Sequence, residues 1–105
     1  MSITFNEFQK QVDERVNRHP AGYFSNEIIL AKMEEEKKEI NEALLAYEQA
    51  PTEENLKAFK IEIGDELFAL ICLANKNNVS IEECFTLMME KNKNRESNQY
   101  KKEDK

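Results

Sequence analysis

Two pairs of acidic residues are spaced so that their side chains can act together. Glu36 and Glu39 stand three residues apart, and so do Glu62 and Asp65. On an α-helix, residues at i and i+3 present their side chains to the same side. If the two helices pack against each other, four carboxylates converge, and at ~5 Å with an effective dielectric constant of about 20 each like-charged pair costs roughly 3 kcal/mol. Such a cluster must bind protons or a cation.

A hard divalent cation suits this set of oxygen ligands. No lysine or arginine falls on the inner stripes of the predicted helices, so a metal ion is the expected source of positive charge. Carboxylate oxygens favour Mg²⁺, with Mn²⁺ as the other choice. The single histidine, His19, is far in sequence from both acid pairs. This argues against a di-iron Glu-x-x-His bundle, a zinc site and a nucleophilic triad.

A plain solvated surface is the competing interpretation of these acids. The chain has 21 acidic residues, so Glu-x-x-Glu spacing arises readily by chance. Glu34 and Lys38, at i and i+4, are typical of an exposed helix face. Glu36 and Asp65, however, fall on the apolar stripes of their helices, where unpaired acids are costly. Their position favours a binding site over a solvated face.

Four helices are predicted from the apolar spacing and from residues suited to helix capping. A serine or threonine stands at each expected N-cap: Thr4, Ser25, Thr52 and Ser80. The predicted helices cover residues 5–16, 26–49, 52–76 (the main part from 56) and 81–94. From 67 to 74 every residue is apolar, which predicts burial on all sides of that helix. The expected fold class is an all-α four-helix bundle.

The composition excludes several classes of protein. At 105 residues the chain is expected to form one domain over 1–95, followed by a polar, flexible tail over 96–105. A net charge of −6 would repel a nucleic-acid duplex. The longest apolar run is too short to span a membrane and the N-terminus lacks a signal-peptide pattern, so we expect a cytoplasmic location. Cys72 and Cys84 lack CxxC spacing, which predicts two reduced thiols packed in the core.

Several stretches of the sequence resemble one enzyme family. Residues 32–43, Lys-Met-Glu-Glu-Glu-Lys-Lys-Glu-Ile-Asn-Glu-Ala, are similar to the EExxE helix of the MazG-type nucleoside triphosphate pyrophosphohydrolases. Residues 62–74 resemble the ExxD helix of that family, including the glycine before the aspartate, and 80–95 resembles its last helix. The resemblance is strongest to small, single-domain bacterial members of YpjD type. One departure is Lys37-Lys38, where relatives often have an apolar residue and a glycine.

The resemblance implies an all-α, metal-dependent enzyme that works as a homodimer or homotetramer. Carried over residue by residue, it implies that Glu36, Glu39, Glu62 and Asp65 are the Mg²⁺ ligands. Glu35, the first acid of the EExxE pattern, would support those ligands. A carboxylate that is not fully committed to the metal would act as general base on the attacking water. Which of the four does so is left open, with Glu39 as our choice.

The same resemblance suggests where the substrate binds. Lys91 and Arg95, at i and i+4 on the last helix, would hold phosphate oxygens, with Asn94 as a further candidate. Alternatively, these residues form a solvated basic end favoured by the helix dipole. Tyr23 and Phe24 follow a predicted helix break, where they form either a wall for a nucleobase or an apolar plug over the end of the bundle.

The activity implied is cleavage of the α–β bond of (d)NTPs to a monophosphate and pyrophosphate, with a role in clearing nucleotides. One alternative is an enzyme similar to phosphoribosyl-ATP pyrophosphohydrolase. Another is a non-catalytic helical module for oligomerisation or regulation. A purely structural core would gain stability from apolar residues in place of Glu36 and Asp65, which argues against the module.

Overall fold

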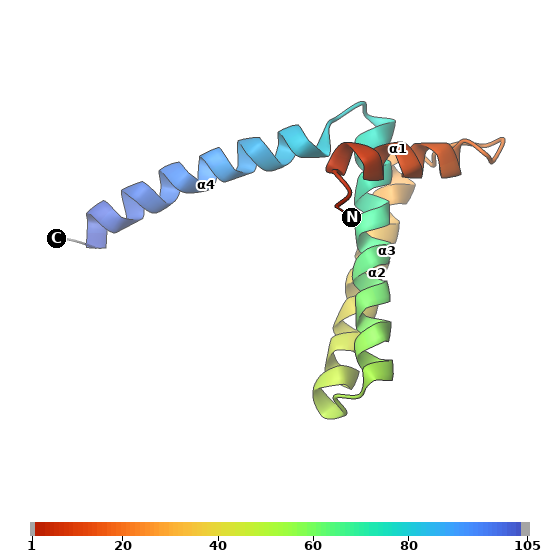
Figure 1. The fold of residues 1–105 in the computed structure, drawn as a ribbon, viewed down its shortest axis with the longest axis horizontal. Helices are drawn as coiled ribbons and strands as arrows, with labels where there is room; N and C mark the ends of the chain where they lie inside the picture. The colour runs from red at the N-terminus through yellow and green to blue at the C-terminus, as the bar shows by residue number, and fades with distance from the viewer. Residues whose placement is uncertain (1, 104–105) are drawn as a thin grey trace.

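Over the part of the chain that it describes, the computed structural model consists of four α-helices joined by short connections (Figure 1). They are α1 (Phe5–Val16), α2 (Asn26–Gln49), α3 (Glu53–Lys76) and α4 (Ile81–Glu103). The structure describes the backbone of residues 2–103 and the side chains of residues 2–95. No β-strand occurs within that range. The all-α class and the four helices predicted from the sequence are therefore confirmed.

Side-chain caps begin the helices where the sequence predicted them. The Thr4 hydroxyl accepts a hydrogen bond from the Glu7 N–H (3.2 Å), and the Glu7 carboxylate accepts one from the Thr4 N–H (3.3 Å). Ser25, Thr52 and Ser80 each accept a hydrogen bond from the backbone N–H three residues later. Each cap satisfies an N–H that has no partner within the helix, so local chemistry determines where the helices begin.

The last helix is longer than predicted. We expected it to end near Asn94, but α4 continues to Glu103. The segment after Asn94 contains neither glycine nor proline, so nothing in its backbone chemistry stops a helix. The side chains of 96–105, which we predicted to form a flexible tail, lie outside the described residues. The domain limits therefore stay a prediction.

The helices form a hairpin with two attachments. α2 and α3 run antiparallel, side by side, and α1 packs across the end of the hairpin where α3 finishes (Figure 1). α4 begins beside α1 and then projects away from α2 and α3 (Figure 1). As a result, the radius of gyration is 17.6 Å, against about 13 Å for a compact domain of 100 residues. A single chain does not close its four helices into one bundle.

The core of a single chain is small. Among the side chains of residues 2–95, five apolar ones are buried: Ile29, Ala69, Ile71, Cys72 and Ala74. The prediction that residues 67–74 are buried on all sides was wrong for one chain, because Leu67, Phe68 and Leu70 remain 42%, 38% and 40% exposed. Both cysteines are free, as predicted, but only Cys72 is buried. Cys84 is exposed because α4 projects from the hairpin instead of folding back over it.

Further apolar side chains lie exposed on α4. Phe85, Leu87 and Met89 are 48%, 57% and 51% exposed. None of the helices that the structure describes offers an apolar stretch long enough to cross a bilayer.

A polar network attaches the start of α4 to the rest of the molecule. The Gln9 amide donates hydrogen bonds to the Asn75 side chain (2.8 Å) and to the Val79 carbonyl (2.9 Å), and its oxygen accepts one from the Ile81 N–H (2.8 Å). The Asn75 amide donates to the Gln9 carbonyl (2.9 Å) and to the Tyr23 hydroxyl (3.0 Å). These hydrogen bonds connect α1, the end of α3, the connection before α2 and the start of α4.

Candidate active site

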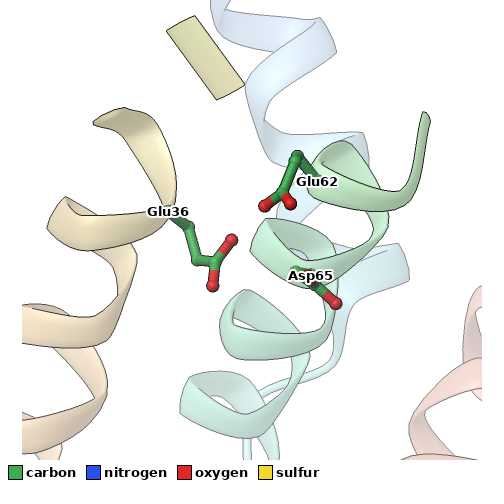
Figure 2. Close-up of side chains that lie close together, drawn as sticks. All are labelled: Glu36, Glu62 and Asp65. Atoms are coloured by element: carbon green, nitrogen blue, oxygen red, sulfur yellow. The ribbon is translucent and has the colours of Figure 1, made fainter. Parts of the chain in front are cut away.

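Three of the four acids predicted to act together meet between α2 and α3. Figure 2 shows Glu36 reaching from α2 toward Glu62 and Asp65 on α3. One carboxylate oxygen from each residue lies within 4.8 Å of the others. The spacing of Glu62 and Asp65 places both on one side of α3, and the antiparallel packing of the hairpin brings Glu36 opposite them. Exposure differs within the cluster, since Glu36 and Glu62 are half-buried and Asp65 is exposed.

The cluster holds more negative charge than its surroundings compensate. Burial, followed by the charge of Glu39 and contacts with Glu62 and Asp65, raises the pKa of Glu36 to about 7. The pKa of Glu62 is also raised, mainly by burial and then by Glu39. Glu39, the fourth predicted ligand, therefore lies beside the other acids and adds to their repulsion.

Two buried oxygens in the cluster lack a partner. The Oε2 atoms of Glu36 and Glu62 are shielded from solvent and accept no hydrogen bond. Buried polar atoms are usually satisfied, and hard divalent cations prefer several oxygen ligands of this kind. The residues present therefore fit a divalent metal ion, which would satisfy both oxygens and offset the repulsion among the carboxylates.

A cavity of about 730 Å³ extends from the acids toward the connection between α1 and α2. Its walls combine three chemistries. The acids are Glu35, Glu36 and Asp65, the aromatic residues are Tyr23, Phe24 and Phe68, and the basic residues are Arg15, His19 and Lys32. The floor includes the buried apolar residues Ile29, Ala69 and Cys72. A ligand of this cavity would carry both an apolar or aromatic part and groups able to approach a metal ion.

Tyr23, predicted to contact the substrate, lines the cavity and is held there by hydrogen bonds to other side chains. Its hydroxyl donates a hydrogen bond to Asp13 (2.7 Å) and accepts one from Asn75 (3.0 Å). Burial and the hydrogen bond to Asp13 raise its pKa to about 12. The hydroxyl is thus committed within the protein, and the ring is the part of Tyr23 that remains for a ligand.

The predicted phosphate-binding residues lie elsewhere. Lys91, Asn94 and Arg95 are exposed on α4, which packs against α1 and projects away from the hairpin (Figure 1). None of the three lines the cavity beside the acids. Within one chain, the structure does not bring them to the carboxylates.

The structure also adds residues that the sequence analysis missed. Lys32 and Arg15 were not singled out in the sequence, yet both line the cavity. The available signal was spacing, since Lys32 precedes Glu36 by four residues, one helical turn. Phe68, three residues after Asp65, lines the cavity through the same rule.

Two features singled out in the sequence do not shape this site within one chain. A Cβ added at Gly64 would meet no atom within 4 Å, so no close approach of another helix requires the glycine. Lys37 is exposed and pairs with Glu34 at 3.1 Å. The unusual lysine at position 37 therefore lies on the outer face of α2, away from the acid cluster.

Both the fold and the sequence have known counterparts. A family model described as the MazG nucleotide pyrophosphohydrolase domain matches residues 24–100. The chain therefore belongs to this family and is a nucleotide pyrophosphohydrolase. It is similar to the uncharacterised protein YpjD of Bacillus subtilis (strain 168), with 33% identity over 104 residues, covering 96% of this chain and 94% of YpjD.

Two crystal structures are similar to this one over most of their length. A Bacillus-conserved MazG protein described as a nucleotide pyrophosphohydrolase aligns with a TM-score of 0.75 and 28% identity, covering 87% of this chain and 90% of its own. The putative pyrophosphatase YpjD from Bacillus subtilis aligns with a TM-score of 0.74 and 32% identity, covering 87% and 95%. The resemblance inferred from the sequence is confirmed.

Proposed function

We propose that this enzyme hydrolyses nucleoside triphosphates between the α- and β-phosphates in a Mg²⁺-dependent reaction, releasing a monophosphate and pyrophosphate. The observation that carries the proposal is the cluster of Glu36, Glu62 and Asp65 at one end of a cavity of about 730 Å³. The aromatic residues along the rest of the cavity suit a nucleobase, and membership of the family supplies the class of reaction. A role in clearing nucleotides and a cytoplasmic location stay predictions.

The ligands proposed for Mg²⁺ are Glu36, Glu39, Glu62 and Asp65, with Mn²⁺ as a substitute. A bound divalent cation would polarise phosphate oxygens and offset the repulsion between the acids and a polyphosphate. Glu39 is proposed as the general base. It neighbours Glu36 and Glu62 but is not among the three acids whose oxygens converge most closely, which leaves it freer to accept a proton from water. Glu35 lines the cavity beside Glu36 and is proposed to help position these ligands.

We also propose that the enzyme is a homodimer or a homotetramer. Exposed apolar residues occur on α3 and on α4, including Leu67, Leu70, Phe85 and Leu87. Burying apolar surface is the main driving force for association. In such an assembly, Lys91, Asn94 and Arg95 of one chain would reach the phosphates bound by another, which accounts for their separation from the acids within a single chain.

Pyrophosphate release from a panel of (d)NTPs with Mg²⁺ tests the proposal directly. Glu39→Gln and Asp65→Asn should each lower kcat/KM by at least about a thousandfold, because both remove charge from the site that stabilises the reacting phosphate. Lys38→Gln, on the solvated side of α2, serves as the control. Folding of the variants is checked by circular dichroism.

Metal binding and substrate class are separated by two further measurements. Mg²⁺ or Mn²⁺ should raise the thermal midpoint of the parent protein, since a ligand that binds only the folded state stabilises it, and this shift should shrink in Asp65→Asn. Phosphoribosyl-ATP belongs in the panel, because turnover of that compound alone would replace the general nucleotide substrate. A protein that binds Mg²⁺ yet hydrolyses none of these compounds would contradict the proposal.

A further inference from the structure

Two cations in the cavity form no ion pair with any acid among the described side chains. Among the side chains described, 2–95, the one ion pair within 4.0 Å joins Lys37 to Glu34. Lys32 and Arg15 instead lie over aromatic rings. The Lys32 ammonium is 5.1 Å from the centroid of the Phe24 ring, and the Arg15 guanidinium is 5.7 Å from that of Phe68. Cation–π contacts of this kind are weak at exposed sites, about 0.5–1 kcal/mol, so both cations are available to a ligand.

Their place in the cavity follows from helical spacing. Lys32 precedes Glu36 by one turn of α2. Phe68, whose ring contacts the Arg15 guanidinium, follows Asp65 by one turn of α3. Because the helices run antiparallel, both steps lead from the acid cluster toward the connection between α1 and α2. The cavity therefore has an acidic end and, one turn away, a basic stretch. An anion held at the acidic end would lie about one helical turn from the two cations.

We propose that Lys32, assisted by Arg15, binds the phosphate groups of the nucleotide within the same chain. This inference rests on the proposed function. Four carboxylates and one divalent cation leave the site negatively charged, so a polyphosphate still meets repulsion until further positive charge is present. Lys32 and Arg15 supply that charge without any contribution from α4. Lys32 has the larger role, because it is on the same helix and the same face as Glu36.

The two aromatic rings influence where the two cations lie. A lysine side chain is long and flexible, and fixing it on binding costs conformational entropy. The Phe24 and Phe68 rings favour positions of Lys32 and Arg15 beside the cavity before a ligand arrives, without fixing them there. When the cations move onto phosphate oxygens, the two rings are left free to contact the apolar part of the same ligand.

The test compares Lys32→Gln with Lys37→Gln. Both remove one positive charge from α2, but Lys37 lies outside the cavity and is paired with Glu34. A hydrogen bond to a charged group contributes about 1.5–3 kcal/mol, so Lys32→Gln should lower kcat/KM for nucleoside triphosphates by about tenfold to a hundredfold. The loss should appear mainly in KM, Lys32→Arg should recover most of it, and Lys37→Gln should stay within about twofold of the parent.

Inorganic pyrophosphate and an uncharged nucleoside separate charge recognition from packing. With Mg²⁺ present, Lys32→Gln should weaken the binding of pyrophosphate by a similar factor and leave that of the nucleoside unchanged. The Mg²⁺-induced rise in the thermal midpoint should also remain, since Lys32 is not a metal ligand. Equal losses for both probes would mean that Lys32 only supports the cavity wall and would overturn the inference.

The outcomes also distinguish this inference from the proposed function. If the parent hydrolyses nucleotides and Lys32→Gln behaves like Lys37→Gln, the phosphate role of Lys32 is wrong and the proposed reaction stands. If the parent hydrolyses no nucleotide but binds pyrophosphate through Lys32, the proposed reaction fails and the anion site stands. If the parent binds no pyrophosphate in the presence of Mg²⁺, the inference fails as well.

Discussion

The hairpin of α2 and α3 differs from the projecting helix α4 in which side chains are buried and which are exposed. The hairpin buries Ile29 and Ile71 and, beside them, keeps acids half-buried without partners. α4 leaves Phe85 and Leu87 about half exposed and carries Lys91 and Arg95, which do not line the cavity beside those acids. The hairpin thus keeps acids partly buried although burying charge is unfavourable, whereas α4 leaves apolar side chains exposed although burying them is favourable. This difference is what the proposed function predicts, with a metal ion and a nucleotide bound to the hairpin and a second chain covering α4.

The largest expected effect comes from removing one acid from the hairpin. Glu36→Gln should lower kcat/KM by about a thousandfold or more, because the charge at the site of the metal and phosphate is lost. The same change should raise the thermal midpoint of the metal-free protein, since repulsion among the acids falls. Glu34→Gln, at an exposed position on the same helix, should change neither quantity appreciably. A Glu36→Gln enzyme with parental activity would contradict the site described above.

Core substitutions should separate the two regions next. Ile71 is 4% exposed on α3, so Ile71→Ala should lower the free energy of unfolding by about 2–5 kcal/mol. Leu87 is 57% exposed on α4, so Leu87→Ala should cost less than about 0.5 kcal/mol in a dilute solution of single chains. Urea denaturation at several protein concentrations measures both values. If the loss for Leu87→Ala grows with protein concentration, assembly buries α4. If Leu87→Ala loses as much unfolding free energy as Ile71→Ala at every concentration, the contrast between the buried hairpin and the exposed α4 is wrong.

A charge placed on α4 should disrupt assembly. Leu87→Asp would put a carboxylate into the apolar surface that we expect to be covered, which is unfavourable unless the charge is paired. The particle mass measured by light scattering should fall toward that of one chain, and kcat/KM should fall by about tenfold. Arg95→Gln should lower kcat/KM by a similar factor without changing the mass. If a variant with both Leu87→Asp and Arg95→Gln loses no more kcat/KM than either single variant, both substitutions act through the same contact. If the two losses multiply fully, Leu87 and Arg95 act independently.

The smallest expected effect is a pH dependence of the metal-free protein. The pKa of Glu36 is about 7 in the folded chain, against 4.5 as its ordinary value. Between these values the folded state binds more protons than the unfolded state, so stability falls as the pH rises from 4.5 through 7. The thermal midpoint in the presence of a chelator should follow this trend, and the slope should flatten in Glu36→Gln. A midpoint that rises over the same window in the parent protein would contradict the assignment.

Local patterns in the sequence determined a large part of this protein. Thr4, Ser25, Thr52 and Ser80 each cap a helix as predicted, because a cap depends on residues only three positions apart. Glu62 and Asp65 also lie together as their i, i+3 spacing predicted, since helical geometry alone places them on one side of α3. The motifs around the two acid pairs sufficed for the family, which the comparisons confirmed.

Tertiary structure alone decided how these parts meet. The periodicity of residues 67–74 predicted burial but did not reveal that one chain leaves Leu67 and Leu70 exposed, because burial depends on every surface that later packs against a helix. The direction of α4, and with it the distance of Lys91 and Arg95 from the acids, follows from the connection at 77–80 and the network around Gln9. The place of Arg15 in the cavity wall was also decided by tertiary packing, because only the packing of α1 across the hairpin brings its side chain beside Phe68.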